Sequence, residues 1–315
     1  MKRTLPVFLV LLMIPLPLFG RGGAEQSSSG TETAGALEVY CYDSFASEWG
    51  PGPAIAAAFE EQTGIQVNLH APGDAVTVLN QLIVEKDRPV ADIVIGLDNS
   101  LLTRALDAGI LQKYKSPELK TVPQELVFDT SFHMLPYDYG HFAVCYDSGV
   151  LKTPPESLEE LTGPEYKNSL VLMDPRTSSP GLGFLLWTAA VYGEQWQNYW
   201  KRLQPSILTI TDSWSQAYTM FTAGEAPLVL SYGTSPVYHA EYEKSTRYRA
   251  AEFSEGHIMQ IEGMGVVSGA KHPEAARAFI DFMLQAESQN TLAMSNIMLP
   301  VNSTVSLPPS FDFAL

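Results

Sequence analysis

Signatures of metal centres, nucleotide sites and common hydrolytic sites are missing from this 315-residue sequence. Its six histidines show no metal-ligand spacing, and no glycine-rich nucleotide loop, serine elbow or paired-carboxylate motif occurs. Basic residues are also few, because 19 lysines and arginines stand against 35 acidic residues and leave a formal net charge of −16. We therefore expect neither a resident metal nor a nucleic-acid partner.

Cysteine and long apolar runs are scarce as well. The only cysteines are Cys41 and Cys145, and both lie inside strand-like apolar runs. One disulfide and two buried free thiols are both compatible with an exported protein. Beyond the start of the chain no long uncharged apolar run occurs, so the sequence predicts no membrane-spanning helix.

The start of the chain has the features of an export signal. Residues 1–24 combine Lys2 and Arg3 with the short apolar run 5–19, and small residues suit cleavage after Ala24. Removal of this signal peptide, with its three basic residues, would change the formal net charge from −16 to −19. We expect the mature protein to be exported from the cytoplasm.

A flexible linker is predicted over residues 25–36, which are rich in Gly, Ser, Thr and Glu. Such a tether suits a protein that works close to a membrane surface. Arg21 stands where a bacterial lipoprotein would have its acylated cysteine, so acylation at that position is excluded.

The rest of the chain is long enough to divide its core between two domains. Its first part alternates strands and helices in the order typical of a doubly wound lobe. The predicted strands are 37–42, 65–69 and 91–97, and the predicted helices are 53–63 and 75–86.

An extended run over residues 135–147 is too long for one ordinary strand in a small sheet, so we interpret it as a crossing between lobes. Strands and helices then alternate again, and residues 256–267 return the chain to the first lobe. The predicted elements are strands at 169–173, 207–210 and 226–231, and helices at 180–192, 215–221 and 273–284.

This organisation predicts an α/β protein of two lobes with a ligand cleft between them and a hinge at the crossings. Lobe 1 is predicted to comprise residues 37–138 and 264–315. Lobe 2 is predicted to comprise residues 139–263 with the crossover strands.

The most informative segment is residues 42–53, YDSFASEWGPGP, directly behind the first strand. It brings Tyr42, Asp43 and Trp49 to the carboxyl end of a strand, which is where open parallel sheets bind their ligands. Asp98 follows the third strand in the same way, although it could instead cap the next helix.

In the second lobe, residues 174–183, DPRTSSPGLG, join a strand to a helix. The free N–H groups of a helix start bind anions, and here Ser178, Ser179 and Gly181 would surround them. A serine that only caps the helix is the alternative interpretation.

Aromatic residues follow other strands of the second lobe, at Trp214, Tyr232 and Tyr238. Together with Tyr42 and Trp49 they would form a group of flat rings suited to planar heteroaromatic or cationic ligands. Core packing is the alternative for any single tyrosine among them.

Taken together, these segments resemble the bacterial periplasmic thiamine-binding proteins, the substrate-binding components of ABC transporters. The resemblance covers residues 37 to about 309. Its motifs are YDSF and WGPGP within 42–53, GLDN at 96–99, DYG at 138–140, the run 174–183, WS at 214–215, LSY at 230–232, TSP at 234–236, YH at 238–239 and FSEGH at 253–257.

This resemblance implies the type II periplasmic binding-protein fold and a function in binding rather than catalysis. The ligand would be thiamine, thiamine monophosphate or thiamine diphosphate, delivered to a membrane permease driven by an ATPase. We expect a monomer without a resident cofactor. By the family's pattern Tyr42 and Tyr238 would flank the aminopyrimidine ring.

The resemblance also suggests partners for the rest of the ligand. Aromatic faces and a carboxylate would meet the cationic thiazolium, and the helix start would meet a terminal hydroxyl or phosphate. The aromatic faces would be Trp49, Trp214 and Tyr232, the carboxylate Asp43 or Asp98, and the helix-start residues Ser178, Ser179 and Gly181.

Two departures from the family pattern stand near the end of the chain. The family usually has Trp after the Asn of its Asn-Trp-Met-Tyr-Pro-Val region, whereas Ile297 follows Asn296 here. Members also commonly continue beyond the position of Leu315 into an amphipathic helix. We therefore expect one stacking wall to be either missing or replaced by aliphatic packing.

Three other functions remain as alternatives. The same fold serves ferric iron, which normally requires clustered tyrosines, and polyamines, which would favour more carboxylates in the cleft. A thiaminase-like enzyme would need a cysteine nucleophile in the cleft. Cys41 is near, but alternation along the strand turns it away from the face of Tyr42.

Overall fold

The computed structural model describes residues 35–315, and no helix among them is long and apolar enough to cross a membrane. The predicted signal peptide, residues 1–24, and most of the predicted linker, residues 25–36, lie outside the described residues.

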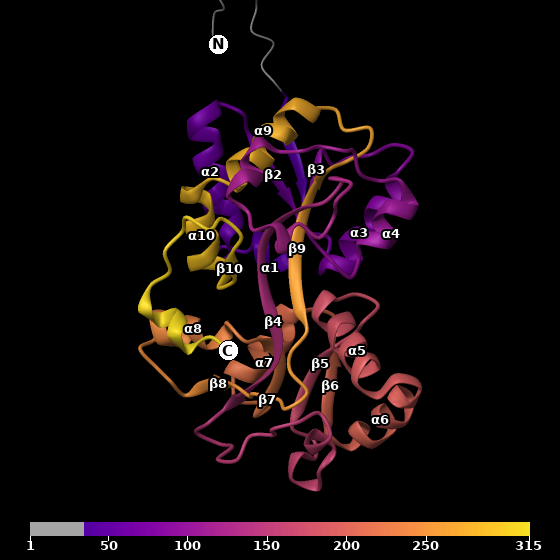
Figure 1. The fold of residues 1–315 in the computed structure, drawn as a ribbon, viewed down its shortest axis with the longest axis vertical. Coiled ribbons are helices and arrows are strands. Elements are labelled where there is room, and N and C mark those ends of the chain that lie inside the picture. The colour runs from indigo at the N-terminus through magenta and orange to yellow at the C-terminus, as the bar shows by residue number, and fades with distance from the viewer. Residues whose placement is uncertain (1–34) are drawn as a thin grey trace, which may run out of the picture. The chain divides into compact units, whose positions relative to one another are not determined.

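The first lobe contains three parallel strands with β1 between β2 and β3. In Figure 1 its helices lie around these strands in the upper part of the view. Its strands are β1 (Leu37–Tyr40), β2 (Val67–His70) and β3 (Ile93–Asp98), and its helices are α1 (Asp43–Ala46), α2 (Pro51–Thr63), α3 (Ala75–Glu85), α4 (Leu102–Ala108), α9 (Pro273–Met283) and α10 (Ala286–Asn296).

Local chemistry explains where these helices begin and end. Pro51 occupies the first position of α2, where its missing N–H costs no hydrogen bond because the N–H groups of the first turn have no partner within the helix. Gly64 ends the helix in the left-handed region with a φ of 73°. The side chain of Asp74 accepts a hydrogen bond from the N–H of Ala75 and caps α3.

The second lobe has a parallel arrangement of its own, with β5 between β6 and β7. Its strands are β5 (Leu170–Met173), β6 (Ile207–Thr211), β7 (Leu228–Tyr232) and β8 (Tyr248–Ala250), and its helices are α5 (Ser179–Tyr192), α6 (Trp196–Leu203), α7 (Trp214–Thr222) and α8 (Ser235–Tyr242).

One long strand, β4 (Leu135–Asp147), belongs to both lobes. Its first half pairs with β9 (Met259–Val266) and β10 (Leu299–Pro300), and its second half pairs with β7 and β8. The strand order is β2-β1-β3-β9-β4-β7-β5-β6, and Figure 1 shows β4 passing from the upper to the lower elements.

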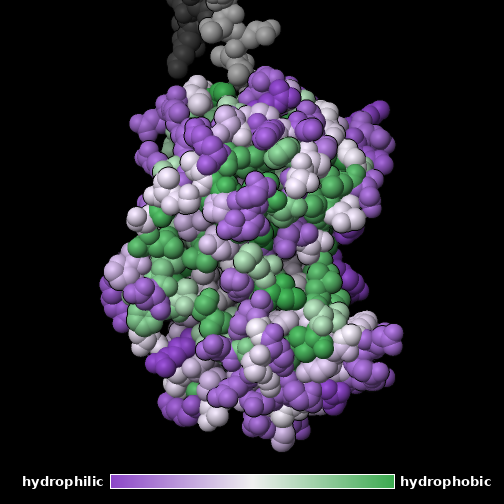
Figure 2. Space-filling view, in the orientation of Figure 1, coloured by the Kyte–Doolittle hydropathy of each residue, from purple (hydrophilic) through white to green (hydrophobic). Residues whose placement is uncertain are grey.

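Separate hydrophobic cores make the two groups of elements into lobes. One core contains Phe45, Phe59 and Phe279, and another contains Trp187 and Phe221. On the face seen in Figure 2 hydrophobic and hydrophilic residues lie side by side. The fold is therefore the predicted two-lobed α/β fold, while the lobe boundaries at residues 138/139 and 263/264 stay a prediction.

Several element ends differ from the sequence-based expectation. β1 ends at Tyr40 instead of residue 42, because the chain turns there into the short helix α1. Helices α6, α8 and α10 are not predicted from the sequence. In α10 the apolar residues follow no single face, so periodicity does not indicate a helix.

Candidate ligand-binding site

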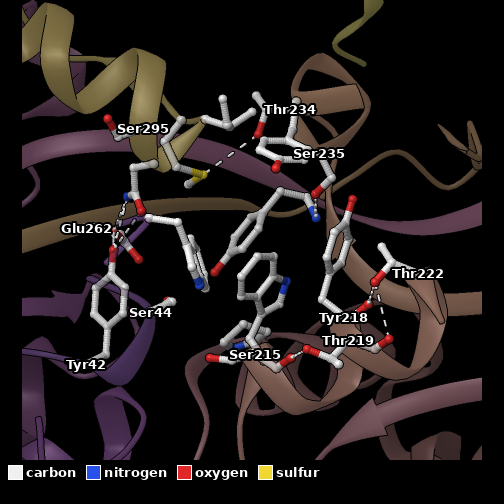
Figure 3. A pocket seen from close by; sticks show the side chains of 18 of the residues that line it. Tyr42, Ser44, Ser215, Tyr218, Thr219, Thr222, Thr234, Ser235, Glu262 and Ser295 are labelled. Atoms are coloured by element: carbon white, nitrogen blue, oxygen red, sulfur yellow. Dashed lines mark hydrogen bonds between the residues drawn. The ribbon is translucent and has the colours of Figure 1, made fainter. Parts of the chain in front are cut away.

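A cavity of about 540 Å³ is lined by residues of both lobes and of α10. This volume lies within the range of about 300 to 1,000 Å³ that is typical of small-molecule sites. Figure 3 shows Tyr42 and Glu262 on one side of the cavity and Tyr218 and Thr222 on the other. Among the residues selected from the sequence, Tyr42, Trp49, Ser179, Trp214, Tyr232 and Tyr238 line it.

The first wall is built around Tyr42. Its ring meets Phe45 edge-on at a centroid distance of 5.7 Å, and its hydroxyl donates to Glu262 Oε2 at 2.9 Å. Gly96 makes room for this ring, because a Cβ at that position would lie 2.1 Å from Tyr42 Cδ1. The GLDN motif therefore contributes to the site through its glycine as well as through Asp98.

Two tryptophans from different lobes meet at the cavity. Trp49 precedes α2 and is 59% exposed, and its ring centroid lies 6.4 Å from that of Trp214 at the start of α7. Trp214 stacks on Tyr218 with centroids 4.9 Å apart and donates from Nε1 to Ser231 Oγ at 2.9 Å. Tyr218 is a lining residue that the sequence analysis did not select. Its position four residues after Trp214 on one helix could have indicated it.

The remaining predicted rings come from β7 and α8. Tyr232 stacks on Phe142 at 5.4 Å, and its hydroxyl donates to Gln260 Oε1 at 3.3 Å. Tyr238 is 43% exposed and meets His239 edge-on. The cavity therefore has rings that are fixed by packing and rings that stand open to a ligand.

Neither predicted carboxylate lines the cavity, but both join the lobes. Asp43 Oδ1 accepts from the hydroxyl of Ser215 at 2.9 Å. Asp98 accepts the hydroxyl of Ser179 and the N–H groups of Ser100 and Leu101, so it also holds the turn before α4. Burial raises the pKa of Asp98 above its usual value.

Ser178 and Gly181 lie at the start of α5 but do not line the cavity. Ser178 occupies the N-cap position without a side-chain hydrogen bond, so the alternative that its hydroxyl caps the helix is wrong. A Cβ on Gly181 would lie 2.4 Å from the carbonyl oxygen of Met173, so this glycine allows α5 to pack closely on β5. The ligand-binding roles of both residues stay predictions.

Two acidic residues of the cavity were missed by the sequence analysis. Glu262 lies within β9 as a lone charged residue in a mostly apolar strand, a pattern that could have indicated a special role. Asp74 caps α3 and also accepts from the N–H of Trp214 at 3.1 Å, which joins the lobes once more. Burial raises the pKa of Asp74 to about 6.

Ile297 lines the cavity at the end of α10, so of the two expectations for this wall, absence or aliphatic packing, the structure favours aliphatic packing. It packs against Val237, Ala293 and Phe311 in a small apolar cluster. Its φ of 54° is in the left-handed region, which is rare for a β-branched residue.

Among the described residues 35–315, the ionisable side chains that line the cavity and are not tyrosines are Asp74, Glu243, Glu262 and His239, and no lysine or arginine lines it. Aromatic faces and negative charge together favour a flat, positively charged ligand. Within residues 35–315 no group of three or more His, Cys, Asp or Glu side chains is arranged to hold a metal ion.

The two cysteines are buried and free, so the structure favours thiols over the disulfide that the sequence left open. Burial, with a smaller effect of Asp43, raises the pKa of the Cys41 thiol to about 12. Cys41 does not line the cavity.

Comparison with known proteins gives consistent relatives. The sequence model of the family described as bacterial extracellular solute-binding protein matches residues 54–313. The chain is 41% identical to the thiamine-binding periplasmic protein of Escherichia coli (strain K12) and 44% identical to that of Salmonella typhimurium (strain LT2). In each case the alignment covers 99% of this chain and 90% of the relative.

A solved structure called periplasmic thiamin binding protein superimposes with a TM-score of 0.85 at 42% identity, covering 91% of this chain and 89% of that one. These relatives confirm both the resemblance indicated by the motifs and the predicted periplasmic location. The chain belongs to the bacterial extracellular solute-binding proteins.

Proposed function

We propose that this protein captures thiamine or one of its phosphates in the periplasm and delivers it to an ABC permease and, through it, to the ATPase. The observation that carries the proposal is the cavity, which is lined by aromatic rings of both lobes and by carboxylates, and by no lysine or arginine of the part of the chain that the structure describes. The names of the relatives support the same ligand. The protein would act as a monomer and need no cofactor.

The chemistry of thiamine fits this lining. Tyr42 and Tyr238 offer flat partners for the aminopyrimidine ring. The thiazolium cation gains about 1 to 2 kcal/mol from a desolvated contact with an aromatic face, which Trp49, Trp214 or Tyr232 would provide. Asp43 and Asp98 lie behind this lining and would add negative charge.

The hydroxyethyl or phosphate end of the ligand would point towards the start of α5. Ser179 is the first residue of that helix and lines the cavity, and Ser178 and Gly181 are its neighbours. The N–H groups of a helix start favour an anion there.

Binding without catalysis is supported by the position of Cys41. A thiaminase-like reaction needs an ionised nucleophile in the cavity, whereas this thiol is buried outside the lining and its pKa is about 12. We expect thiamine to be recovered chemically unchanged after prolonged incubation with the protein. Cleaved thiamine, detected by chromatography, would favour the enzyme instead.

Tryptophan fluorescence tests the ligand directly. We expect thiamine or a thiamine phosphate to quench the emission of the protein with micromolar or tighter affinity. Trp214→Ala should weaken binding by about 2 kcal/mol or more, roughly 30-fold, because large aromatic residues dominate such sites. Trp196→Ala, on α6 outside the cavity lining, is the matched control and should keep the affinity.

Ferric ion and spermidine should cause no saturable quenching. The assignment would fail if no form of thiamine gave a saturable response, or if either competing cation bound more tightly. An unchanged affinity in Trp214→Ala would show that Trp214 does not contribute to binding, and it would leave the proposed ligand unaffected.

A further inference from the structure

Three carboxyl groups lie at one level across adjacent strands beside the cavity. In the register of the sheet, Glu262 on β9 is the partner of Asp98 on β3 and of Asp138 on β4. Directly opposed residues of neighbouring strands place their side chains on the same face. All three are buried, with exposed fractions of 1% for Asp98, 1% for Asp138 and 5% for Glu262.

Neutral groups surround this row, and among residues 35–315 no cationic side chain pairs with Asp138 or Glu262. Glu262 Oε2 accepts from the hydroxyls of Tyr42 at 2.9 Å and Tyr137 at 2.5 Å, and its Oε1 accepts from Gln260 at 2.8 Å. Asn296 donates to Asp138 Oδ2 at 2.7 Å. The other titratable groups that face the pair are Asp98 and, through Gln260, Tyr232.

Asp138 and Glu262 cannot both be ionised at low energetic cost. Asp138 Oδ1 is buried and receives no hydrogen bond while both groups act as acceptors. With a proton on Asp138, this carboxyl donates to Glu262 and the orphaned oxygen is satisfied. Burial first, and then the charge of Glu262, hold the pKa of Asp138 well above its usual value. The pair therefore shares one proton, as neighbouring carboxyl groups do in a low dielectric.

We propose that Asp138 and Glu262 form a proton-sharing pair that senses the positive charge of the ligand and releases its proton when the cation enters the cavity. This inference rests on the proposed function, because it needs a cationic ligand such as thiamine. Glu262 lines the cavity, and Asp138 lies directly opposite it on the neighbouring strand β4, which joins the lobes.

The charge balance of the step is simple. Burial raises the pKa of Glu262 to about 7, so above this pH and before binding the pair carries one negative charge and one proton. The thiazolium cation makes the second ionisation favourable, the proton leaves the Asp138 carboxyl for the solvent, and no covalent bond of the ligand changes. Because binding releases a proton, mass action makes binding tighter as the pH rises towards the pKa of the free pair, by up to about tenfold per pH unit. Above that pKa the affinity should not depend on pH.

Calorimetry in two buffers of different ionisation enthalpy, phosphate and Tris, measures the proton directly. With thiamine as the probe between pH 7 and 8, we expect the wild-type protein to release up to about one proton per ligand bound. Asp138→Asn should lose this release and the rise of affinity with pH. Asp147→Asn is the matched variant, because it changes a buried acid that does not line the cavity and should keep the release. A proton from the ligand itself would appear equally in all three proteins.

A second measurement needs no variant. Difference infrared spectroscopy should show a protonated-carboxyl band in the free protein that disappears when thiamine is added. Thiamine binding without proton release, or with the same release in Asp138→Asn, would overturn this inference and leave the proposed function intact. A failure of every thiamine form to bind would overturn both.

Discussion

Gly96 shows how one residue without a side chain can shape the cavity. Its φ of 94° is in the left-handed half of the backbone map, and the ring of Tyr42 occupies the space that a Cβ would need. Tyr42 can therefore reach Glu262 only because position 96 is glycine.

Gly96→Ala should harm both binding and stability. The new methyl group would displace the Tyr42 ring and break its hydrogen bond with Glu262, so we expect the thiamine affinity to fall about tenfold, which corresponds to 1.4 kcal/mol. Fluorescence titration measures the affinity, and urea unfolding measures the stability.

Gly224→Ala provides the matched control for this change. Gly224 also has a left-handed φ, of 79°, but a Cβ there would meet nothing within 4 Å. It should cost about 1 kcal/mol of stability through backbone strain alone and leave the affinity unchanged. Equal affinities in both alanine variants would show that the ring of Tyr42 is not needed where the structure places it.

At the scale of elements, the end of α10 contributes a wall to the cavity. The helix ends at Asn296, whose amide reaches Asp138, and Ile297 follows in a left-handed conformation. A β-branched residue is strained there, and it supplies an aliphatic surface where the family pattern has an indole.

Ile297→Trp should tighten thiamine binding. An added ring beside the aromatic walls is expected to contribute about 1 kcal/mol, roughly fivefold in affinity. Ile297→Leu is the control, because it removes the branching at Cβ without adding a ring, and it should change stability more than affinity. Weaker binding in the Trp variant, measured by fluorescence titration, would mean that the cavity has no room for the ring.

Helices and strands with strong local signals are predictable from this sequence. The Asp74 cap and the apolar pattern behind it predict α3, and Pro273 marks the start of α9. Helix α8 escapes prediction although Ser235 and Pro236 open it, because the whole helix has only eight residues and their pattern has no clear apolar face. Short elements are determined mainly by what they pack against.

Across the whole molecule, the two lobes meet through carboxylates. Asp43, Asp74 and Asp98 of the first lobe accept hydrogen bonds from the starts of α5 and α7 in the second. Helix starts attract negative charge, so these contacts favour the closed arrangement. The consequence is a concentration of buried acids next to the cavity.

The free energy of unfolding of the ligand-free protein should fall as the pH rises from about 4 to 8. Burial raises the pKa of Asp74 to about 6 and holds that of Asp98 and Asp138 above the usual value. Carboxyl groups in an unfolded chain titrate near pH 4, so the folded state binds more protons in this interval, and raising the pH removes that advantage. Scanning calorimetry across the interval measures the slope.

Two variants sharpen this test. Asp138→Asn should make the decrease of the unfolding free energy with pH less steep, because the amide has no proton to lose. Asp147→Asn should leave the slope above pH 5 unchanged. Hydrogen bonds with Arg247 lower the pKa of Asp147, so its stabilising effect is lost only as the pH falls through that lowered pKa. A stability that rises steadily towards pH 8 in the absence of ligand would contradict the prediction.

The sequence by itself determined the order of the predicted strands and helices, the long strand between the lobes and the positions of Tyr42, Trp49 and Asp98 on segments that follow or end strands, because these follow from local periodicity and turn chemistry. Only the tertiary structure decided which side chains meet. Tyr42 bonds with Glu262, 220 positions away in the chain, and Glu262 stands beside Asp138. Such partners depend on the register between β3, β9 and β4, and the side-chain pattern of a single strand does not specify which residue of its neighbour lies opposite.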